Sequence, residues 1–120
     1  MEKFTLLGTS GAVADDQRDN VSFVFRSQHE ALLDDFFILV ECGGSAAHKL
    51  AKLGIAYEQL EHIIITHTHT DHLYGLPGLI FSSIYRDQER TAPLHIYCPE
   101  EAVDVIGSFL DFFELRDERF

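Results

Sequence analysis

The sequence predicts a single domain of the α/β (α+β) class, in which helices cover a β-sheet. The chain has 120 residues, which is enough for one compact domain and too few for two. Its hydrophobic content of 46%, with ten phenylalanines and four tyrosines, can fill a core and argues against disorder. Strand patterns lead the chain and then alternate with helical patterns, which is the order typical of a covered sheet.

Three strand patterns come first. Residues 4–7 are mostly apolar and end at the turn-forming residues 8–11. Residues 21–25 are rich in valine and phenylalanine, which favour strands. Residues 36–40 (FFILV) are apolar at every position. We therefore expect this third strand to be buried on both faces, in a sheet with layers on either side.

Helices and strands alternate in the rest of the chain. Ser45 suits the N-cap of a short helix that extends to Leu53, and Gly54 is well placed to end that helix. The following patterns predict, in order, a turn at 57–61, a strand at 62–66, a helix that opens at 76–77, a strand at 94–98 and an amphipathic helix over 99–113.

His67, His69, Asp71 and His72 place three imidazoles and one carboxylate within six residues, between a strand and a helix. We expect a tight loop on which these side chains converge. Imidazole and carboxylate suit zinc, with manganese and iron as alternatives, and the lack of a nearby cysteine argues against a structural thiolate site. Four donors this close are hard to aim at one ion. They fit two divalent ions about 3.5–4 Å apart, a geometry used in hydrolysis.

The motif resembles the signature of the metallo-β-lactamase superfamily, histidine-x-histidine-x-aspartate-histidine. The segments 7–13, 18–22, 41–44 and 75–79 resemble the ribonuclease Z branch of that superfamily. The resemblance extends from Phe4 to about Glu101. It implies a metallo-β-lactamase-like αββα sandwich, built from two αβ halves whose sheets pack face to face. Because family members are more than twice as long, residues 1–120 look like the N-terminal half.

The resemblance also implies roles for the motif residues. His67 and His69 would bind the first metal ion, and Asp71 and His72 the second. Asp71 would also be catalytic, by orienting the attacking water or taking its proton. The function implied is that of a hydrolase, a phosphodiesterase resembling the tRNA 3′-end endonuclease ribonuclease Z, with a water activated by two metal ions. The remaining ligands of the family would follow Phe120, so this chain alone carries an incomplete site.

The charge of the chain leaves other functions open. The formal net charge is −11, and the basic residues are scattered, which argues against a general nucleic-acid surface on this segment. One alternative is therefore a hydrolase of the same fold that acts on a small phosphodiester, a cyclic nucleotide or an ester. Another is a non-catalytic half-domain. Since half of a sandwich leaves an apolar sheet surface bare, either reading predicts a homodimer or association with the C-terminal half.

The other residues of interest predict no second site. Cys42 and Cys98 have neither zinc-ribbon nor redox spacing and are expected to be reduced, buried thiols of a cytoplasmic protein. We expect no signal peptide and no membrane segment, because the apolar stretches are shorter than the ~20 residues of a span. Residues 8–11 lack the lysine of a phosphate-binding loop and are expected to form a tight turn near the site mouth. Surface or hydrogen-bonded roles are expected for His29, His48 and His62, whereas His95 is expected to lie inside a strand, at a position where the family has no ligand.

Overall fold

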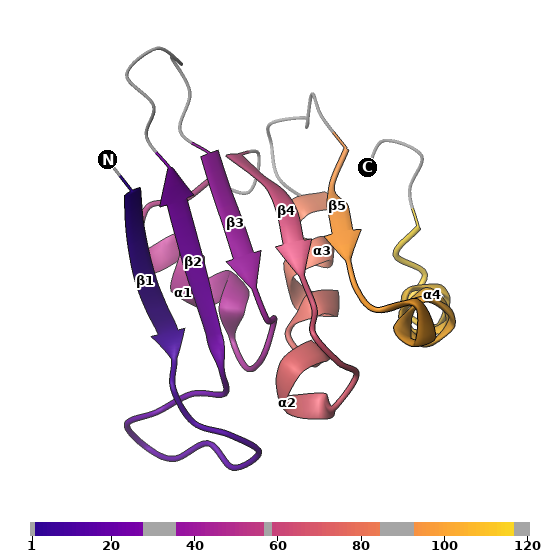
Figure 1. Ribbon diagram of the computed structural model, residues 1–120, viewed down its shortest axis with the longest axis horizontal. Helices are drawn as coiled ribbons and strands as arrows, with labels where there is room; N and C mark the ends of the chain where they lie inside the picture. The colour runs from indigo at the N-terminus through magenta and orange to yellow at the C-terminus, as the bar shows by residue number, and fades with distance from the viewer. Residues whose placement is uncertain (1, 28–35, 57–58, 85–92, 117–120) are drawn as a thin grey trace.

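The computed structural model describes residues 2–27, 36–56, 59–84 and 93–116. These residues form a five-stranded mixed sheet with helices packed against it, which confirms the predicted class (Figure 1). The strands are β1 (Glu2–Gly8), β2 (Ser22–Ser27), β3 (Phe36–Val40), β4 (Leu60–Ile64) and β5 (His95–Tyr97). The helices are α1 (Ala46–Lys52), α2 (Thr70–Leu73), α3 (Leu76–Ile84), the 3₁₀ turn η2 (Glu100–Ala102) and α4 (Val103–Phe112).

The strands lie in sequence order across the sheet. β2 is antiparallel to both β1 and β3, whereas β3, β4 and β5 are parallel. Four strands, all except β2, therefore run in one direction and end at one edge of the sheet. The β1–β2 connection and α2 both lie at that edge (Figure 1). Segments that are far apart in the sequence thus meet where the predicted metal motif begins.

One face of the sheet carries the core. Leu39 of β3 and Ile63 of β4 have no exposed surface, and α1 and α3 lie behind the sheet (Figure 1). Both helices contribute buried leucines to this core, Leu50 from α1 and Leu76 and Leu79 from α3. Burial of these side chains contributes about 1.5–3 kcal/mol each and is the main force that holds the helices on the sheet.

The opposite face is apolar but uncovered by any described residue. The strand register places these apolar side chains on the uncovered face: Phe4, Leu6, Phe23, Phe25, Ile38, Val40 and Ile64. His62, His95 and Tyr97 of β4 and β5 lie on the same face. Phe4 and Leu6 are each 59% exposed, and the other five apolar side chains are partly exposed. The expectation that β3 is buried on both faces is therefore wrong for the described residues. The pattern of β3 is apolar on both sides, yet helices cover only one of them.

Three local predictions need correction. β4 starts at Leu60 and ends at Ile64, whereas the pattern predicted a strand at 62–66. Part of the turn predicted at 57–61, residues 57–58, lies outside the described residues. The predicted loop over the metal motif contains the helical turn α2, in which the Tyr74 N–H donates to the Thr70 carbonyl at 2.9 Å. The C-terminal helix is split into η2 and α4.

Asp19 joins the β1–β2 connection to the start of α1. Its Oδ2 accepts hydrogen bonds from the Ser45 N–H at 3.0 Å and from the Ser45 hydroxyl at 2.7 Å. Ser45 is the N-cap residue, as predicted, but its side chain makes no capping bond to the helix. Burial opposes ionisation of Asp19, but the bonds from Ser45 and Asn20 and the charge of Lys49 outweigh it, so the pKa of Asp19 lies below its usual value.

We expect Asp19→Asn to lower the free energy of unfolding by about 1 kcal/mol at neutral pH, the usual net contribution of a hydrogen bond. Because the folded-state pKa is depressed, this stabilisation is present above the unfolded-state pKa, about 3.9, and is lost as the pH falls through the lower folded-state value. Urea unfolding at neutral and at acidic pH measures the difference. The control is Asp16→Asn on the same connection. A loss that does not change with pH would contradict the role of the charge.

Cys42 and Cys98 are free, as predicted. Cys42 is fully buried, and burial, together with the nearby charge of Glu41, raises the pKa of its thiol to about 12. Cys98 is only partly buried. Among the described residues, none of the helices has the length and apolar character needed to cross a bilayer. The cytoplasmic location stays a prediction.

Candidate metal centre

The metal motif follows β4 at the edge where the strands end. After β4, Ile65 is buried and its N–H donates to the Tyr97 carbonyl at 2.9 Å, so the chain stays on the sheet for one more residue. The chain then leaves the sheet through His67 and His69. His69 is the N-cap residue of α2, with extended backbone angles, and α2 carries the next two motif residues.

Backbone contacts fix α2 against the end of β3. The Cys42 N–H donates to the His72 carbonyl at 2.9 Å, and the Gly75 N–H donates to the Cys42 carbonyl at 2.8 Å. A Cβ atom on Gly43 would lie only 2.0 Å from the Asp71 carbonyl oxygen. Glycine is therefore required at this position for α2 to approach the turn that follows β3.

The structure brings the four predicted ligands together. The ring centroids of His67 and His69 are 4.6 Å apart, and those of His67 and His72 are 3.9 Å apart. Nε2 of His72 lies 3.3 Å from Oδ2 of Asp71. Within the described part of the chain, however, no three side chains of the ligand-forming types are placed to hold one metal ion. The cluster fits zinc or a similar ion in its donor chemistry, and its role as a ligand set stays a prediction.

Glu41 is a site residue that the sequence analysis missed. It directly follows β3, and its Oε2 lies 2.6 Å from Nδ1 of His72. Its Oε1 accepts a hydrogen bond from the Thr66 N–H at 3.0 Å. In the sequence, Glu41 is only the first residue of the family-like segment 41–44, and a single acidic residue at a strand end carries no metal-site pattern.

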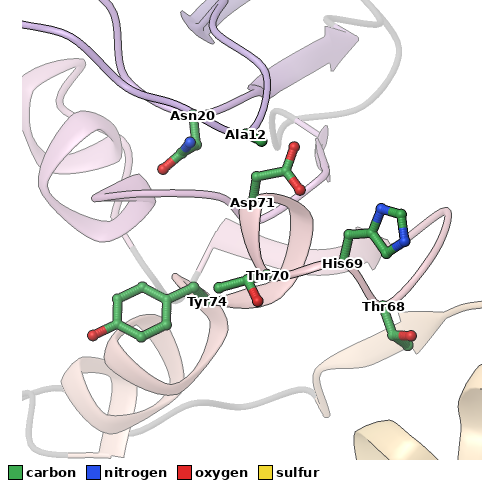
Figure 2. A pocket seen from close by; sticks show the side chains of 7 residues that line it. All are labelled: Ala12, Asn20, Thr68, His69, Thr70, Asp71 and Tyr74. Carbon is green, nitrogen blue, oxygen red and sulfur yellow. The ribbon is translucent and has the colours of Figure 1, made fainter.

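A cavity of about 470 Å³ lies beside the motif. Ala12 and Asn20 of the β1–β2 connection face Asp71 across it, with His69 and Tyr74 on either side (Figure 2). The connection does approach the site mouth as predicted, but the lining comes from residues 12 and 20 and not from 8–11. The Asn20 amide is held by a bond to the Gly11 carbonyl at 2.8 Å.

The other histidines lie apart from this cluster. His62 and His95 are neighbours on β4 and β5, with ring centroids 5.5 Å apart, and Nδ1 of His62 lies 3.0 Å from the Tyr97 hydroxyl. The hydrogen-bonded role expected of His62 is thus confirmed. His48 is exposed on α1, as expected of a surface residue. His29 lies outside the described residues.

Comparison with known proteins identifies the family. The family described as "Anti-Pycsar protein Apyc1" matches residues 2–110. The chain belongs to this Apyc1 family. Among curated proteins, the Apyc1-family chain is 37% identical over 119 residues to the Ribonuclease Z of Methanothermobacter thermautotrophicus and 35% identical over 115 residues to that of Bacteroides fragilis. These matches cover 93% and 94% of the chain. They cover only 36% and 35% of the relatives, so the chain spans about a third of their length.

Solved structures agree on the fold. The short form of human tRNase Z superposes with a TM-score of 0.72 at 28% identity, over 97% of this chain and 40% of that one. The metallo-β-lactamase fold protein YhfI from Bacillus subtilis superposes with a TM-score of 0.73 at 24% identity, over 98% and 44%. The Apyc1-family chain therefore has the metallo-β-lactamase fold over part of such a domain. The predicted resemblance to the superfamily and its ribonuclease Z branch is confirmed.

Proposed function

We propose that this chain carries the metal-binding part of a hydrolase that cleaves phosphodiester bonds. The observation that carries the proposal is the meeting of His67, His69, Asp71 and His72 at one end of β4, beside a cavity. The similarity to Ribonuclease Z proteins supports the same reaction class. Two divalent metal ions, with zinc as the preferred metal, would lower the pKa of a bound water. They would also offset the negative charge that develops on the phosphoryl oxygens.

Each side chain has a distinct part in the proposal. His67 and His69 hold one ion, and Asp71 and His72 hold the other. Asp71 also lines the cavity, so its carboxylate can orient the attacking water or take its proton. Since no three donors among the described residues are placed for one ion, each pair needs further ligands from elsewhere. We propose that the sheet layer that packs on the uncovered face supplies them.

Two observations bear on the substrate, and they favour substrates of different size. The Ribonuclease Z relatives favour a tRNA precursor. The described residues that line the cavity include no lysine or arginine, and the chain has a formal net charge of −11. Phosphate binding by nucleic-acid partners rests mainly on those basic side chains, so the cavity itself favours a small phosphodiester such as a cyclic nucleotide.

Hydrolysis assays on the purified, zinc-loaded protein test the proposal. The substrates are a tRNA precursor with a 3′ extension, a cyclic nucleotide and bis(p-nitrophenyl) phosphate. We expect a chelator to remove activity and added zinc to restore it. We expect Asp71→Asn to lower kcat by about 100-fold or more, the usual contribution of a positioned acid or base. Asp104→Asn, on the exposed start of α4, is the control. Activity that survives both the chelator and Asp71→Asn would rule the proposal out.

A second copy of the chain is one source of the layer that would cover the sheet. The uncovered face presents exposed phenylalanine and leucine, and soluble monomers rarely leave such a surface bare. Light scattering on wild type and on Leu6→Lys tests this possibility. We expect a dimer that the lysine dissociates. If the wild type is monomeric, a second copy does not cover this face, and the covering layer would have to come from another part of a longer protein.

A further inference from the structure

A second cavity, of about 400 Å³, adjoins the cavity beside the metal motif. Tyr74 lines both cavities, so its side chain lies where the two meet. The other walls of the second cavity come from the start of α1, from α3 and from Phe113 at the end of α4. In Figure 2, the Tyr74 ring extends from the end of α2 on the side of Asp71 opposite to His69.

The second cavity differs in chemistry from the first. Its described lining residues include no carboxylate, lysine or arginine, and His48 is the one histidine among them. Two aromatic rings border it, those of Tyr74 and Phe113, which are 68% and 45% exposed. Phosphate groups are bound mainly by lysine and arginine, whereas aromatic rings stack on flat, uncharged groups. The lining therefore suits a flat aromatic group and not a phosphate.

Local contacts hold both rings in place. The Tyr74 N–H donates to the Thr70 carbonyl at 2.9 Å, which fixes the residue at the end of α2. Phe113 packs edge-to-face on Phe109, with ring centroids 5.2 Å apart, and its N–H donates to the Phe109 carbonyl at 3.3 Å. Rings that are exposed but already held in position lose little freedom when a ligand stacks on them.

Tyr74 connects the second cavity to the metal motif. It follows Asp71 by three residues on the α2 turn, so the two side chains lie on one face, with about 5–6 Å between their Cβ atoms. In a nucleotide, one ribose joins the phosphate to the base and spans a similar distance. A base is therefore within reach of the Tyr74 ring when its phosphate lies at Asp71. The volume is near the lower end of the ~300–1,000 Å³ range of ligand pockets, which suits one base and not a run of bases.

We propose that the second cavity is a nucleobase subsite. The base of a small nucleotide substrate stacks on Tyr74, and Phe113 provides a second aromatic wall. The phosphodiester then lies at the metal motif, and the base determines how it is presented there. This inference rests on the proposed function for the position of the phosphate.

The first experiment compares two ligands that carry the same phosphate, adenosine 5′-monophosphate (AMP) and ribose 5-phosphate, which has no base. NMR titration of the zinc-loaded wild type measures both affinities. We expect AMP to bind about 10-fold more tightly or better, the usual contribution of a base stacked on an aromatic ring. Equal affinities, or no binding of either ligand, would overturn the proposal.

The second experiment repeats the titrations on variants of the cavity. Tyr74→Ala removes the ring and Tyr74→Phe keeps it. Gly78→Leu fills the cavity, since Gly78 lines it and a Cβ there meets nothing within 4 Å. The control is Phe81→Ala, because Phe81 is an exposed aromatic residue of α3 that lines neither of the two described cavities.

We expect Tyr74→Ala and Gly78→Leu to bind AMP no more tightly than ribose 5-phosphate. We expect Tyr74→Phe and Phe81→Ala to keep the preference for AMP. A preference for AMP that survives Tyr74→Ala or Gly78→Leu would overturn the subsite. Since Tyr74 and Gly78 are both exposed, these variants test the cavity without disturbing the core.

Competition against AMP distinguishes the possible sources of the base. We expect 3′,5′-cyclic AMP to displace AMP from the wild type at lower concentration than a tRNA precursor does. The reverse order would overturn the assignment to a small nucleotide. A preference for AMP that depends on Tyr74, in a protein that hydrolyses no phosphodiester, would instead overturn the proposed function alone.

Discussion

The Gly43→Ala variant is expected to lose both stability and zinc affinity. A Cβ at this position would lie 2.0 Å from the Asp71 carbonyl oxygen and 2.9 Å from the Val21 carbonyl oxygen. Both are backbone atoms, so rotation of a side chain cannot relieve the clash. Forcing extra atoms into a packed site usually costs about 1–3 kcal/mol, and we expect at least that loss here because α2 must move.

Movement of α2 would also disturb the metal centre. The helix carries Asp71 and His72, and it is held to the end of β3 through Cys42. Denaturant unfolding and zinc competition measure the two effects. Gly78→Ala on α3 is the matched control, since a Cβ there meets nothing within 4 Å, and alanine favours a helix by about 0.8–1 kcal/mol over glycine. A Gly43→Ala protein with wild-type stability and zinc affinity would show that the close approach is unnecessary.

Leu39→Ala is expected to cost about 2–5 kcal/mol of unfolding free energy, the range for a leucine removed from a packed core. Leu39 has no exposed surface and belongs to β3, in the sheet behind which α1 and α3 lie (Figure 1). Its neighbour Ile38 points to the uncovered face and is partly exposed. In a monomer, we therefore expect Ile38→Ala to cost clearly less, about 1 kcal/mol, because little packing is lost.

Urea unfolding of the two variants, with light scattering to establish the oligomeric state, makes the comparison. Equal losses in a monomer would contradict the one-sided core described here. Equal losses in an associated form would instead show that a second layer covers Ile38.

The sequence predicted where the strands and the longer helices lie along the chain, because each has a clear pattern. It could not show that β3 is covered on one side only. Ile38 and Val40 are as apolar as their buried neighbours, and a pattern does not reveal which layers are present. The short helix α2 was also missed. Four residues are too few for a helical period, and contacts from Cys42 and Gly75 hold it in place.

The candidate ligands were predictable because three histidines and an aspartate in six residues are chemically distinctive. Glu41 was not predictable as a site residue, because it reaches the site through a contact with His72, which lies 31 positions further along the chain. That contact exists only because β3 and β4 pair in parallel and end at the same edge of the sheet. Asn20 reaches the cavity for a similar reason, through the β1–β2 connection.

The proposed function depends on the binding of divalent metal by His67, His69, Asp71 and His72. Elemental mass spectrometry of the zinc-loaded and desalted protein tests it most directly, on wild type, the double variant His67→Ala/His69→Ala and the control His95→Gln. We expect wild type and the control to retain zinc, and the double variant to bind it at least about 100-fold more weakly, since even outer partners of metal ligands contribute 10–100-fold. A wild type without metal, or a double variant that keeps as much zinc as wild type, would contradict the account.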